Sequence, residues 1–280
     1  VRIENCLSPT VCVRSGVPQG SVLGPILFIL YINDVTDILV DDVSCKLYAD
    51  DLKLYCPIVP TLGFSESLQT SLDNLCDWSV KRQLPINVDK SFFVTISRNN
   101  ICNCVHSYRI LCSMLTRRFS VDDLGIAYDC NLCFDNYVNN IASSAKAKVG
   151  LLFRSFKTRD PALLKRAYVT YIRPKLEYAS NLWNPFHKTT IAVLENVQRY
   201  FTRRIPSLSI FSYEERLAML NLDTLEKRRL KSDLVLYYKI LHGLSSIPAS
   251  AFDTYNTCSV SRSKSSLLRK KYSWYSSMLF

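Results

Sequence analysis

The sequence predicts an α+β fold, with a front half of mixed strands and helices and an all-helical back half. Three observations support this prediction. Glycine accounts for only 7 of 280 residues, against an average of roughly 7%, which argues against glycine-punctuated β-architectures. Apolar and polar residues alternate on both sides of the pair Asp50-Asp51, as is typical of strands. Beyond Asp135, apolar residues recur at helical spacing through several successive segments.

The front half begins with short extended stretches and turns over residues 1–20, where proline and glycine recur. Residues 21–35 predict a buried helix, because apolar side chains fill most positions and Ser21 is a suitable N-cap. The alternating segments Ser44–Ala49 and Leu52–Cys56 predict a β-hairpin with Asp50-Asp51 as its turn. The other elements expected before residue 130 are a helix over 64–81, with Leu68, Leu72, Leu75 and Val80 on one face, a strand over 91–97, and weak short strands over 99–129.

The back half is expected to consist of helices joined by short loops. These helices are expected over residues 136–157, 161–173, 188–205, 212–220 and 223–243. The sequence shows no repeat of fixed period, which excludes a solenoid. From residue 245 onward it is rich in Ser, Lys and Arg, and we expect this tail to be partly disordered.

The charge is divided unevenly along the chain. The net charge is +11, from 35 Lys and Arg against 24 Asp and Glu. Residues 1–100 hold 8 basic and 11 acidic side chains, which leaves 27 basic and 13 acidic ones for residues 101–280. Such a basic half favours a polyanionic partner, nucleic acid before membrane, although a merely well-solvated basic surface has the same composition. The candidate nucleic-acid-binding residues are Arg199, Arg203, Arg204, Lys227, Arg228 and Arg229.

Cysteine usage indicates a reducing intracellular compartment, nucleus or cytoplasm. The 11 cysteines are odd in number and form no framework, and the sequence shows neither a glycosylation sequon nor a signal peptide. The longest apolar run, residues 22–32, is 11 residues long, short of the ~20 that span a bilayer, so no membrane partner is expected. The sequence lacks a P-loop, a G-x-G-x-x-G or G-x-S-x-G motif and a repeated zinc-binding spacing. It therefore does not support an ATPase, a dehydrogenase or a serine hydrolase.

The adjacent residues Asp50 and Asp51 are the candidate catalytic centre. Two carboxylates in a tight turn repel each other, and one resists ionisation unless a cation neutralises the pair. If both carboxylates simply face water, the turn has no chemical role. The alternative is a Mg²⁺ site, since Mg²⁺ takes oxygen ligands and is often bound by one or two carboxylates together with substrate phosphates. The turn by itself leaves both interpretations open.

A second motif lies upstream of this turn. Residues 16–25 read Gly-Val-Pro-Gln-Gly-Ser-Val-Leu-Gly-Pro, and residues 48–51 read Tyr-Ala-Asp-Asp. This pair of motifs resembles the palm of a reverse transcriptase, most closely the enzymes of non-long-terminal-repeat (non-LTR, LINE-type) retrotransposons of the jockey and CR1 kinds. In that family the first element is called motif B and the second motif C.

The resemblance implies roles for individual residues. The residues implied to bind substrate or template are Gln19, Gly20, Tyr48 and Ala49. The residues implied to be catalytic are Asp50, Asp51 and Lys90, of which Asp50 and Asp51 would also hold the metal. Lys90 precedes a predicted strand in Ile-Asn-Val-Asp-Lys, which resembles the family's motif D, where a lysine would protonate the departing pyrophosphate. The alternative for Lys90 is a solvated turn lysine.

The resemblance covers residues 13–244 and implies how the chain is organised. It includes Leu124-Gly125-Ile126 and the segment Tyr171–Pro185, which look like the region that follows the palm in jockey-like elements. Four regions are expected: a partial palm with an antiparallel sheet and packed helices (1–98), connecting strands and a loop (99–135), a basic helical thumb-like region (136–244) and a basic Ser-rich tail (245–280).

The implied activity is RNA-directed DNA polymerisation. A primer 3′-hydroxyl would attack a deoxynucleoside triphosphate on an RNA template, with two Mg²⁺ ions as cofactors. Palms of this family need a further aspartate on an adjacent upstream strand, motif A, and Glu4 is the only acidic residue before Asp34. We therefore expect the chain to be incomplete and inactive by itself. The alternative is a non-catalytic nucleic-acid-binding remnant.

Overall fold

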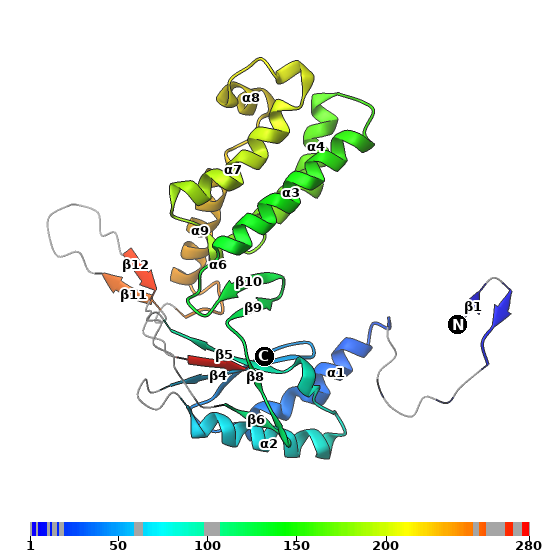
Figure 1. Ribbon diagram of the computed structural model, residues 1–280, viewed down its shortest axis with the longest axis vertical. Coiled ribbons are helices and arrows are strands. Elements are labelled where there is room, and N and C mark those ends of the chain that lie inside the picture. The colour runs from blue at the N-terminus through cyan, green and yellow to red at the C-terminus, as the bar shows by residue number, and fades with distance from the viewer. Residues whose placement is uncertain are drawn as a thin grey trace. The chain divides into compact units, whose positions relative to one another are not determined.

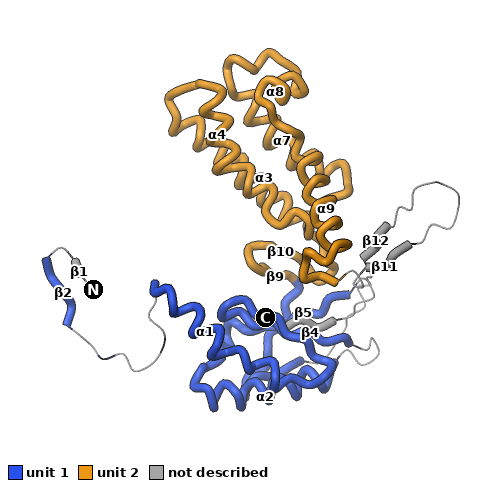
Figure 2. The backbone as a smooth tube through the Cα atoms, turned by 180° about the vertical axis from the view of Figure 1, so that it is seen from behind, with its two compact units in different colours: residues 1–119, 274–280 blue, residues 120–273 orange. Residues whose placement is uncertain are grey.

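The computed structural model describes residues 2–3, 5–9, 12, 16, 20–58, 64–97, 107–248, 252–255, 267–270 and 276–279. The chain divides into two compact units: unit 1 comprises residues 1–119 and 274–280, and unit 2 comprises residues 120–273 (Figure 2). Unit 1 combines a sheet with helices, whereas long helices dominate unit 2 (Figure 1). The α+β fold predicted from the sequence is confirmed.

Unit 1 is built around a five-stranded sheet. Its strand order is β3-β4-β13-β5-β8. Neighbouring strands run antiparallel, except β5 and β8, which run parallel. The bounds of these strands are Ser44–Tyr48 for β3, Asp51–Pro57 for β4, Phe92–Ile96 for β5, Thr116–Arg117 for β8 and Ser276–Leu279 for β13. Two small pairs accompany the sheet: β1 (Arg2–Ile3) with β2 (Cys6–Leu7), and β6 (Arg109–Ile110) with β7 (Ser113–Met114).

The helices of unit 1 are α1 (Gly24–Ile32), the 3₁₀ helices η1 (Asn33–Ile38) and η2 (Val88–Lys90), and α2 (Glu66–Arg82). Helix α2 begins at Ser65, whose side chain accepts a hydrogen bond from the third following backbone N–H. Its apolar face packs in one cluster with Leu54 of β4 and Phe93 of β5. Of the four residues predicted for that face, Leu68, Leu72 and Leu75 are buried. The prediction was wrong for Val80, which is 73% exposed.

Helix α1 corrects a second expectation. The sequence predicted a buried helix over 21–35, yet only Gly24 and Ile32 of α1 are buried. Leu30, in the middle of the apolar run, is 69% exposed. Apolar side chains surround the whole helix, so one neighbour cannot cover them all, and within the described residues most of its surface stays uncovered.

Unit 2 begins with the hairpin of β9 (Ser120–Asp123) and β10 (Ile126–Asp129) and continues with helices. The helices are α3 (Asp135–Ser155), α4 (Pro161–Tyr171), α5 (Arg173–Glu177), α6 (Ser180–Trp183), α7 (Lys188–Arg203), η3 (Pro206–Leu208), α8 (Tyr213–Leu220) and α9 (Leu225–Leu241). All five predicted helices of the back half are confirmed. The segment predicted as one helix over 161–173 ends at Tyr171, because Pro174 supports a new helix start at α5.

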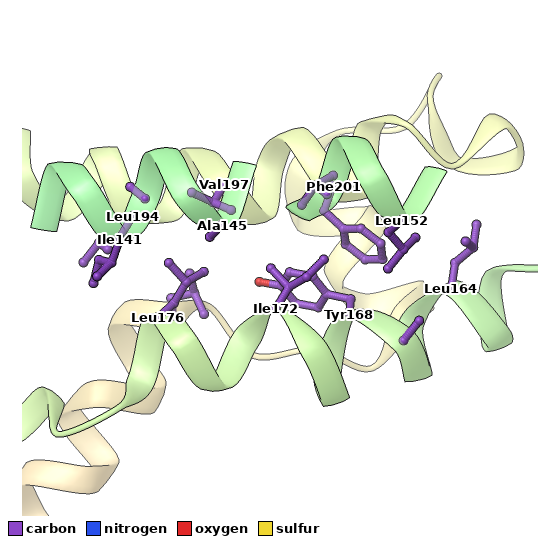
Figure 3. Packing of buried hydrophobic residues seen from close by; sticks show 14 of the residues in the cluster. Ile141, Ala145, Leu152, Leu164, Tyr168, Ile172, Leu176, Leu194, Val197 and Phe201 are labelled. Atoms are coloured by element: carbon purple, nitrogen blue, oxygen red, sulfur yellow. The ribbon is translucent and has the colours of Figure 1, made fainter. Parts of the chain in front are cut away.

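The core of unit 2 lies between α3, α4 and α7. Figure 3 shows Ala145 of α3, Tyr168 of α4 and Phe201 of α7 among the side chains that meet there. The rings of Tyr168 and Phe201 stack with their centroids 4.3 Å apart. The buried hydroxyl of Tyr168 donates to Gln198 Oε1 at 3.0 Å, so this polar group is satisfied inside an apolar core.

The described part of the tail forms short strands. β11 (Phe252–Tyr255) pairs with β12 (Leu267–Lys270) in unit 2, and β13 belongs to the sheet of unit 1. The other tail residues, about which partial disorder was predicted, lie outside the described residues. The four regions predicted along the chain stay a prediction.

Candidate functional site

The two aspartates lie at the tip of a β-hairpin. β3 and β4 pair in the register that joins Tyr48 to Asp51, so Ala49 and Asp50 form a two-residue turn. The turn lies one residue earlier than predicted, because Asp51 is already the first residue of β4. Ala49 has a φ of 52°, a left-handed conformation that lets a two-residue turn follow the twist of its strands. All four residues of this tip are exposed.

The side chains next to the tip differ in exposure. Tyr48 is 64% exposed. Lys53 lies two residues beyond Asp51, on the same face of β4 because side chains alternate along a strand, and it is only 8% exposed. The sequence analysis did not single out Lys53. The period of two along β4 was the available signal, since it places one basic side chain next to the acidic tip on that face.

The described part of the upstream motif leads into α1. Gly20 has a φ of +83°, which favours glycine at this position. Ser21 Oγ accepts a hydrogen bond from the backbone N–H of Gly24 at 3.0 Å, as the expected cap of this helix start should. Gln19, the other residue predicted to bind substrate or template here, lies outside the described residues.

Lys90 ends the short 3₁₀ helix that leads into β5. Its backbone N–H donates to Asn87 Oδ1 at 3.2 Å, which fixes the turn before the strand. The Lys90 side chain is exposed. The turn and the following strand agree with the prediction, and the catalytic role of Lys90 stays a prediction.

The donor set at the hairpin tip is compatible with Mg²⁺ but small. Two exposed carboxylates, Asp50 and Asp51, suffice where Mg²⁺ keeps several waters and substrate phosphates as its other ligands. Over the described residues, no group of three or more His, Cys, Asp and Glu side chains comes together that could hold a metal ion. A third carboxylate at this tip is therefore not supplied by the described part of the chain.

Asp34, the next acidic residue after Glu4, has a structural environment. Its carboxylate accepts a hydrogen bond from Trp78 Nε1 at 3.1 Å and pairs with the Arg82 guanidinium. The hydrogen bond from Arg82 is the main cause of the lowered pKa of Asp34. These contacts tie η1 to the last turns of α2.

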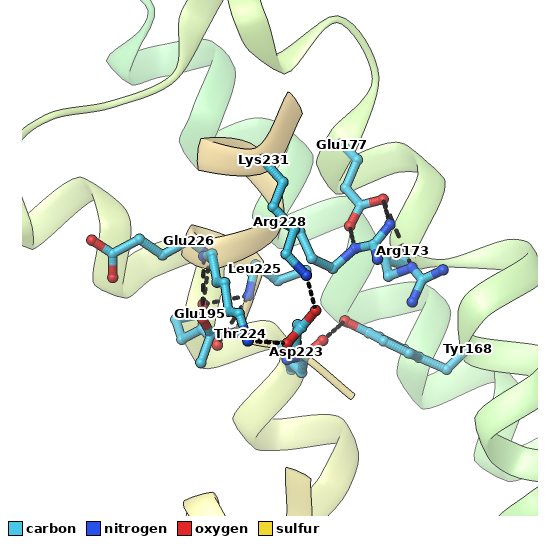
Figure 4. A network of polar contacts seen from close by, with 12 residues as sticks. Tyr168, Arg173, Glu177, Glu195, Asp223, Thr224, Leu225, Glu226, Arg228 and Lys231 are labelled. Carbon is cyan, nitrogen blue, oxygen red and sulfur yellow. Dashed lines mark hydrogen bonds and ion pairs between the residues drawn. The ribbon is translucent and has the colours of Figure 1, made fainter. Parts of the chain in front are cut away.

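Three of the six predicted nucleic-acid-binding residues are engaged within unit 2. Arg229 is 1% exposed and its Nε donates to Asn184 Oδ1 at 3.0 Å. Arg228 pairs with Glu177, and Lys227 Nζ lies 2.7 Å from Asp223 Oδ1. Figure 4 shows the last two pairs at the start of α9. In the described arrangement these basic groups neutralise acidic partners of the same unit.

The other three residues lie on α7 among aromatic rings. Arg203 and Arg204 are exposed. Arg204 Nη1 donates to the hydroxyl of Tyr200 at 2.7 Å, and Lys146 of α3 lies 6.0 Å from the same ring. Arg199 stacks over a different ring, that of Tyr213, at 4.3 Å. Lys146, Tyr200, Arg203 and Arg204 are called the α3–α7 basic cluster below.

Lys146 was missed by the sequence analysis. It precedes Tyr200 by 54 positions, so no local pattern joins them. The helical spacing of α3 and α7 predicted two amphipathic helices, but not which polar faces would lie side by side. No helix in the described part of the chain is long and apolar enough to cross a membrane.

Comparison with known proteins places these features in a family context. Residues 2–140 match the family model for reverse transcriptase (RNA-dependent DNA polymerase). The chain is similar to the uncharacterized protein B0403.1 of Caenorhabditis elegans, with 32% identity over 126 residues that cover 44% of this chain and 64% of that protein. It is also similar to the RNA-directed DNA polymerases from mobile element jockey of Drosophila funebris (27% identity over 214 residues) and Drosophila melanogaster (26% identity over 215 residues). Each of these matches covers 73% of this chain.

The chain spans 23% of the length of each jockey enzyme. No solved structure gives a significant match. The activity, substrates and partners of the longer jockey enzymes are therefore a matter of proposal for this chain.

Proposed function

Residues 2–140 of this chain belong to the reverse transcriptase family, and on this premise we propose that the chain is part of an RNA-directed DNA polymerase of a non-LTR retrotransposon. The observation that carries the proposal is the exposed Tyr-Ala-Asp-Asp tip of the β3–β4 hairpin, which lies within the matched residues. The substrates of the complete enzyme are deoxynucleoside triphosphates, an RNA template and a DNA primer. Their reaction joins the primer 3′-hydroxyl to the α-phosphate and releases pyrophosphate.

The residues of the proposed site divide the work by their chemistry. Asp50 and Asp51 would hold Mg²⁺, which stabilises the negative charge on the attacking and leaving oxygens. Gln19 and Gly20 would position the nucleotide and template, with Tyr48 and Ala49 next to the metal. Lys90 would donate a proton to the departing pyrophosphate or neutralise it.

Metal binding at the tip is testable without activity. Mn²⁺ is a suitable probe because it accepts the same oxygen ligands as Mg²⁺ and broadens the NMR signals of nearby amides. We expect Mn²⁺ to broaden the amide signals of residues 48–52 in the intact chain, and Asp50→Asn to abolish this effect. Asp37→Asn, at an exposed carboxylate on η1, is the matched control and should leave the broadening in place. Broadening that survives Asp50→Asn would remove the metal role from the tip.

The chain by itself is expected not to polymerise. Because no third carboxylate joins Asp50 and Asp51 in the described part of the chain, the two-metal arrangement would be incomplete. A primer-extension assay with a primed RNA template, Mg²⁺ and deoxynucleotides should yield no extended primer. Synthesis by the purified chain that is lost in Asp50→Asn would show that the chain is active as it stands.

A second candidate function is non-catalytic binding of nucleic acid by unit 2. The α3–α7 basic cluster favours it, because exposed guanidinium groups beside a partly exposed Tyr200 offer phosphate contacts and a stacking surface. Arg199, Lys227, Arg228 and Arg229 are weaker candidates, since the contacts described above already engage them.

The salt dependence of binding distinguishes this function from a solvated basic surface. Fluorescence anisotropy with an RNA–DNA hybrid should show affinity that falls steeply as salt rises. The double variant Arg203→Ala/Arg204→Ala should reduce the slope of log K against log salt by about 1–2. The double variant Lys188→Ala/Lys239→Ala removes the same charge from exposed positions elsewhere in unit 2 and should keep the slope. Equal losses in both variants would contradict a site at the cluster.

A further inference from the structure

A strand from a distant part of the chain fills the centre of the sheet in unit 1. β13 pairs antiparallel with β4 on one side and with β5 on the other. β4 and β5 are not neighbours in the sheet, so they lie about 10 Å apart, the width of one intervening strand. This space between them is called the β4–β5 slot below.

The slot has walls that do not depend on β13. Leu54 of β4 and Phe93 of β5 are 0% and 2% exposed and belong to one apolar cluster with Leu68 and Leu72 of α2. Helix α2 therefore anchors both strands from one face of the sheet. Without β13, the two strands would face each other across the slot with unpaired backbone groups, and such edges pair readily with another extended segment.

The occupant covers only part of the slot. β4 has seven residues, and β13 pairs with four of them, Leu54–Pro57. Leu279 is paired with Leu54 on one side and with Phe93 on the other. Three further positions in the same register reach Asp51 on the β4 side (54 − 3 = 51) and Lys90 on the β5 side (93 − 3 = 90). A longer strand in the slot would therefore extend to the level of both predicted catalytic residues.

We propose that the β4–β5 slot is a docking site for one extended polypeptide segment, and that residues 276–279 occupy it as a replaceable strand. The backbone of the segment supplies most of the affinity, as in other cases of strand addition to a sheet. A segment of seven or more residues fills the four rows that β13 holds and the three beyond them, so it displaces residues 276–279. The inference rests on the sheet register and is independent of the proposed polymerase function.

Peptide binding tests the replaceable strand. The probe is a fluorescent peptide with the sequence of residues 271–280, titrated into the full chain and into a variant that lacks residues 274–280. We expect the shortened chain to bind the probe at least ten-fold more tightly, because the full chain must first release its own strand. The same peptide with Ser277→Pro, which loses a ladder N–H, should not bind. Equal affinities for both chains, or no binding to a folded shortened chain, would overturn the proposal.

A longer peptide tests the three open rows. Three threonines added after Phe280 favour the extended conformation and would pair up to the level of Asp51. We expect the extended peptide to bind the shortened chain at least three-fold more tightly than the first probe. Equal affinity would show that the slot ends where β13 ends.

Hydrogen exchange tests the same proposal within the full chain. Ser277→Pro should increase the exchange of amides in Leu54–Cys56 and Val94–Ile96 at least ten-fold and leave those of α2 protected. Ser277→Thr, which keeps the N–H, should match the parent chain. Unchanged exchange in Ser277→Pro would overturn the docking of residues 276–279. If the parent chain is a dimer that Ser277→Pro converts to a monomer, the strand comes from a second copy, and the assignment within one chain is overturned.

Discussion

The carboxylate of Asp223 shows how one residue links pH to the stability of unit 2. It lies just before α9, 2.7 Å from Lys227 Nζ and 2.8 Å from Lys231 Nζ (Figure 4). The hydrogen bond from Lys227, followed by that from Lys231, lowers the pKa of Asp223 from 3.8 to about 2. Because the folded pKa lies below the unfolded one, the pair stabilises the folded state above pH about 4 and loses this effect as the pH falls toward 2.

Asp223→Asn should therefore flatten the acid limb of stability. We expect the melting temperature of the parent chain to fall between pH 4 and 2 by more than that of the variant, as measured by far-UV circular dichroism. Glu214→Gln, at an exposed position of α8, is the control and should follow the parent curve. Parallel curves for the parent and Asp223→Asn would contradict the assigned role.

Ala49 carries backbone strain at the hairpin tip. Its φ of 52° costs a non-glycine residue about 1 kcal/mol, and glycine would adopt it freely. We expect Ala49→Gly to stabilise unit 1 by about 0.5–1 kcal/mol in urea denaturation. Ala127→Gly on β10, where φ is not positive, should destabilise unit 2 instead. A loss of stability in Ala49→Gly would mean that the tip is not held in this conformation.

At the scale of single elements, α1 offers a test of its uncovered apolar surface. Leu30 is 69% exposed and Ile32 is 6% exposed on the same helix. We expect Leu30→Lys to change the free energy of unfolding by less than about 0.5 kcal/mol and to reduce self-association in light scattering. Ile32→Ala should cost about 2–4 kcal/mol, because it opens space in a packed cluster. The reverse order of these two losses would show that α1 is covered after all.

The helices were predictable from sequence to the extent that their signals are local. Helix α2 has its cap at Ser65 and its buried leucines at helical spacing, so one segment carried the whole prediction. The burial of α1 was not predictable, because an apolar run does not state which neighbour covers it. The interior position of Arg229 was equally hidden, since its partner Asn184 lies 45 positions upstream.

The candidate site was predictable at its tip and not around it. The alternation on both sides of Asp50-Asp51 fixed the hairpin to within one residue. The placement of β13 beside β4 depends on pairing between positions more than 200 residues apart, and no periodicity in either segment encodes it. The left-handed Ala49 was missed because alanine is not a usual signal for that conformation.

At the scale of the whole molecule, the two units have separate cores. The apolar cluster of unit 2 runs from Ile126 to Leu225 and contains no residue of unit 1. We expect residues 120–248, produced alone, to be helical by circular dichroism and to unfold in one cooperative transition. Binding of the same RNA–DNA hybrid by this piece would locate the second candidate function in unit 2. A piece without a cooperative transition would show that unit 2 needs unit 1 to fold.

The interrupted sequence of unit 1 also has a consequence for how the protein is made. β5 ends at Ile96 and β13 begins at Ser276, so 180 positions separate them on the ribosome (276 − 96 = 180). At roughly 5–20 residues per second, the sheet waits about 10–35 seconds for its central strand. All of unit 2 except its last residues is synthesised during this interval. The nascent sheet is thus left open to whichever extended segment reaches it first.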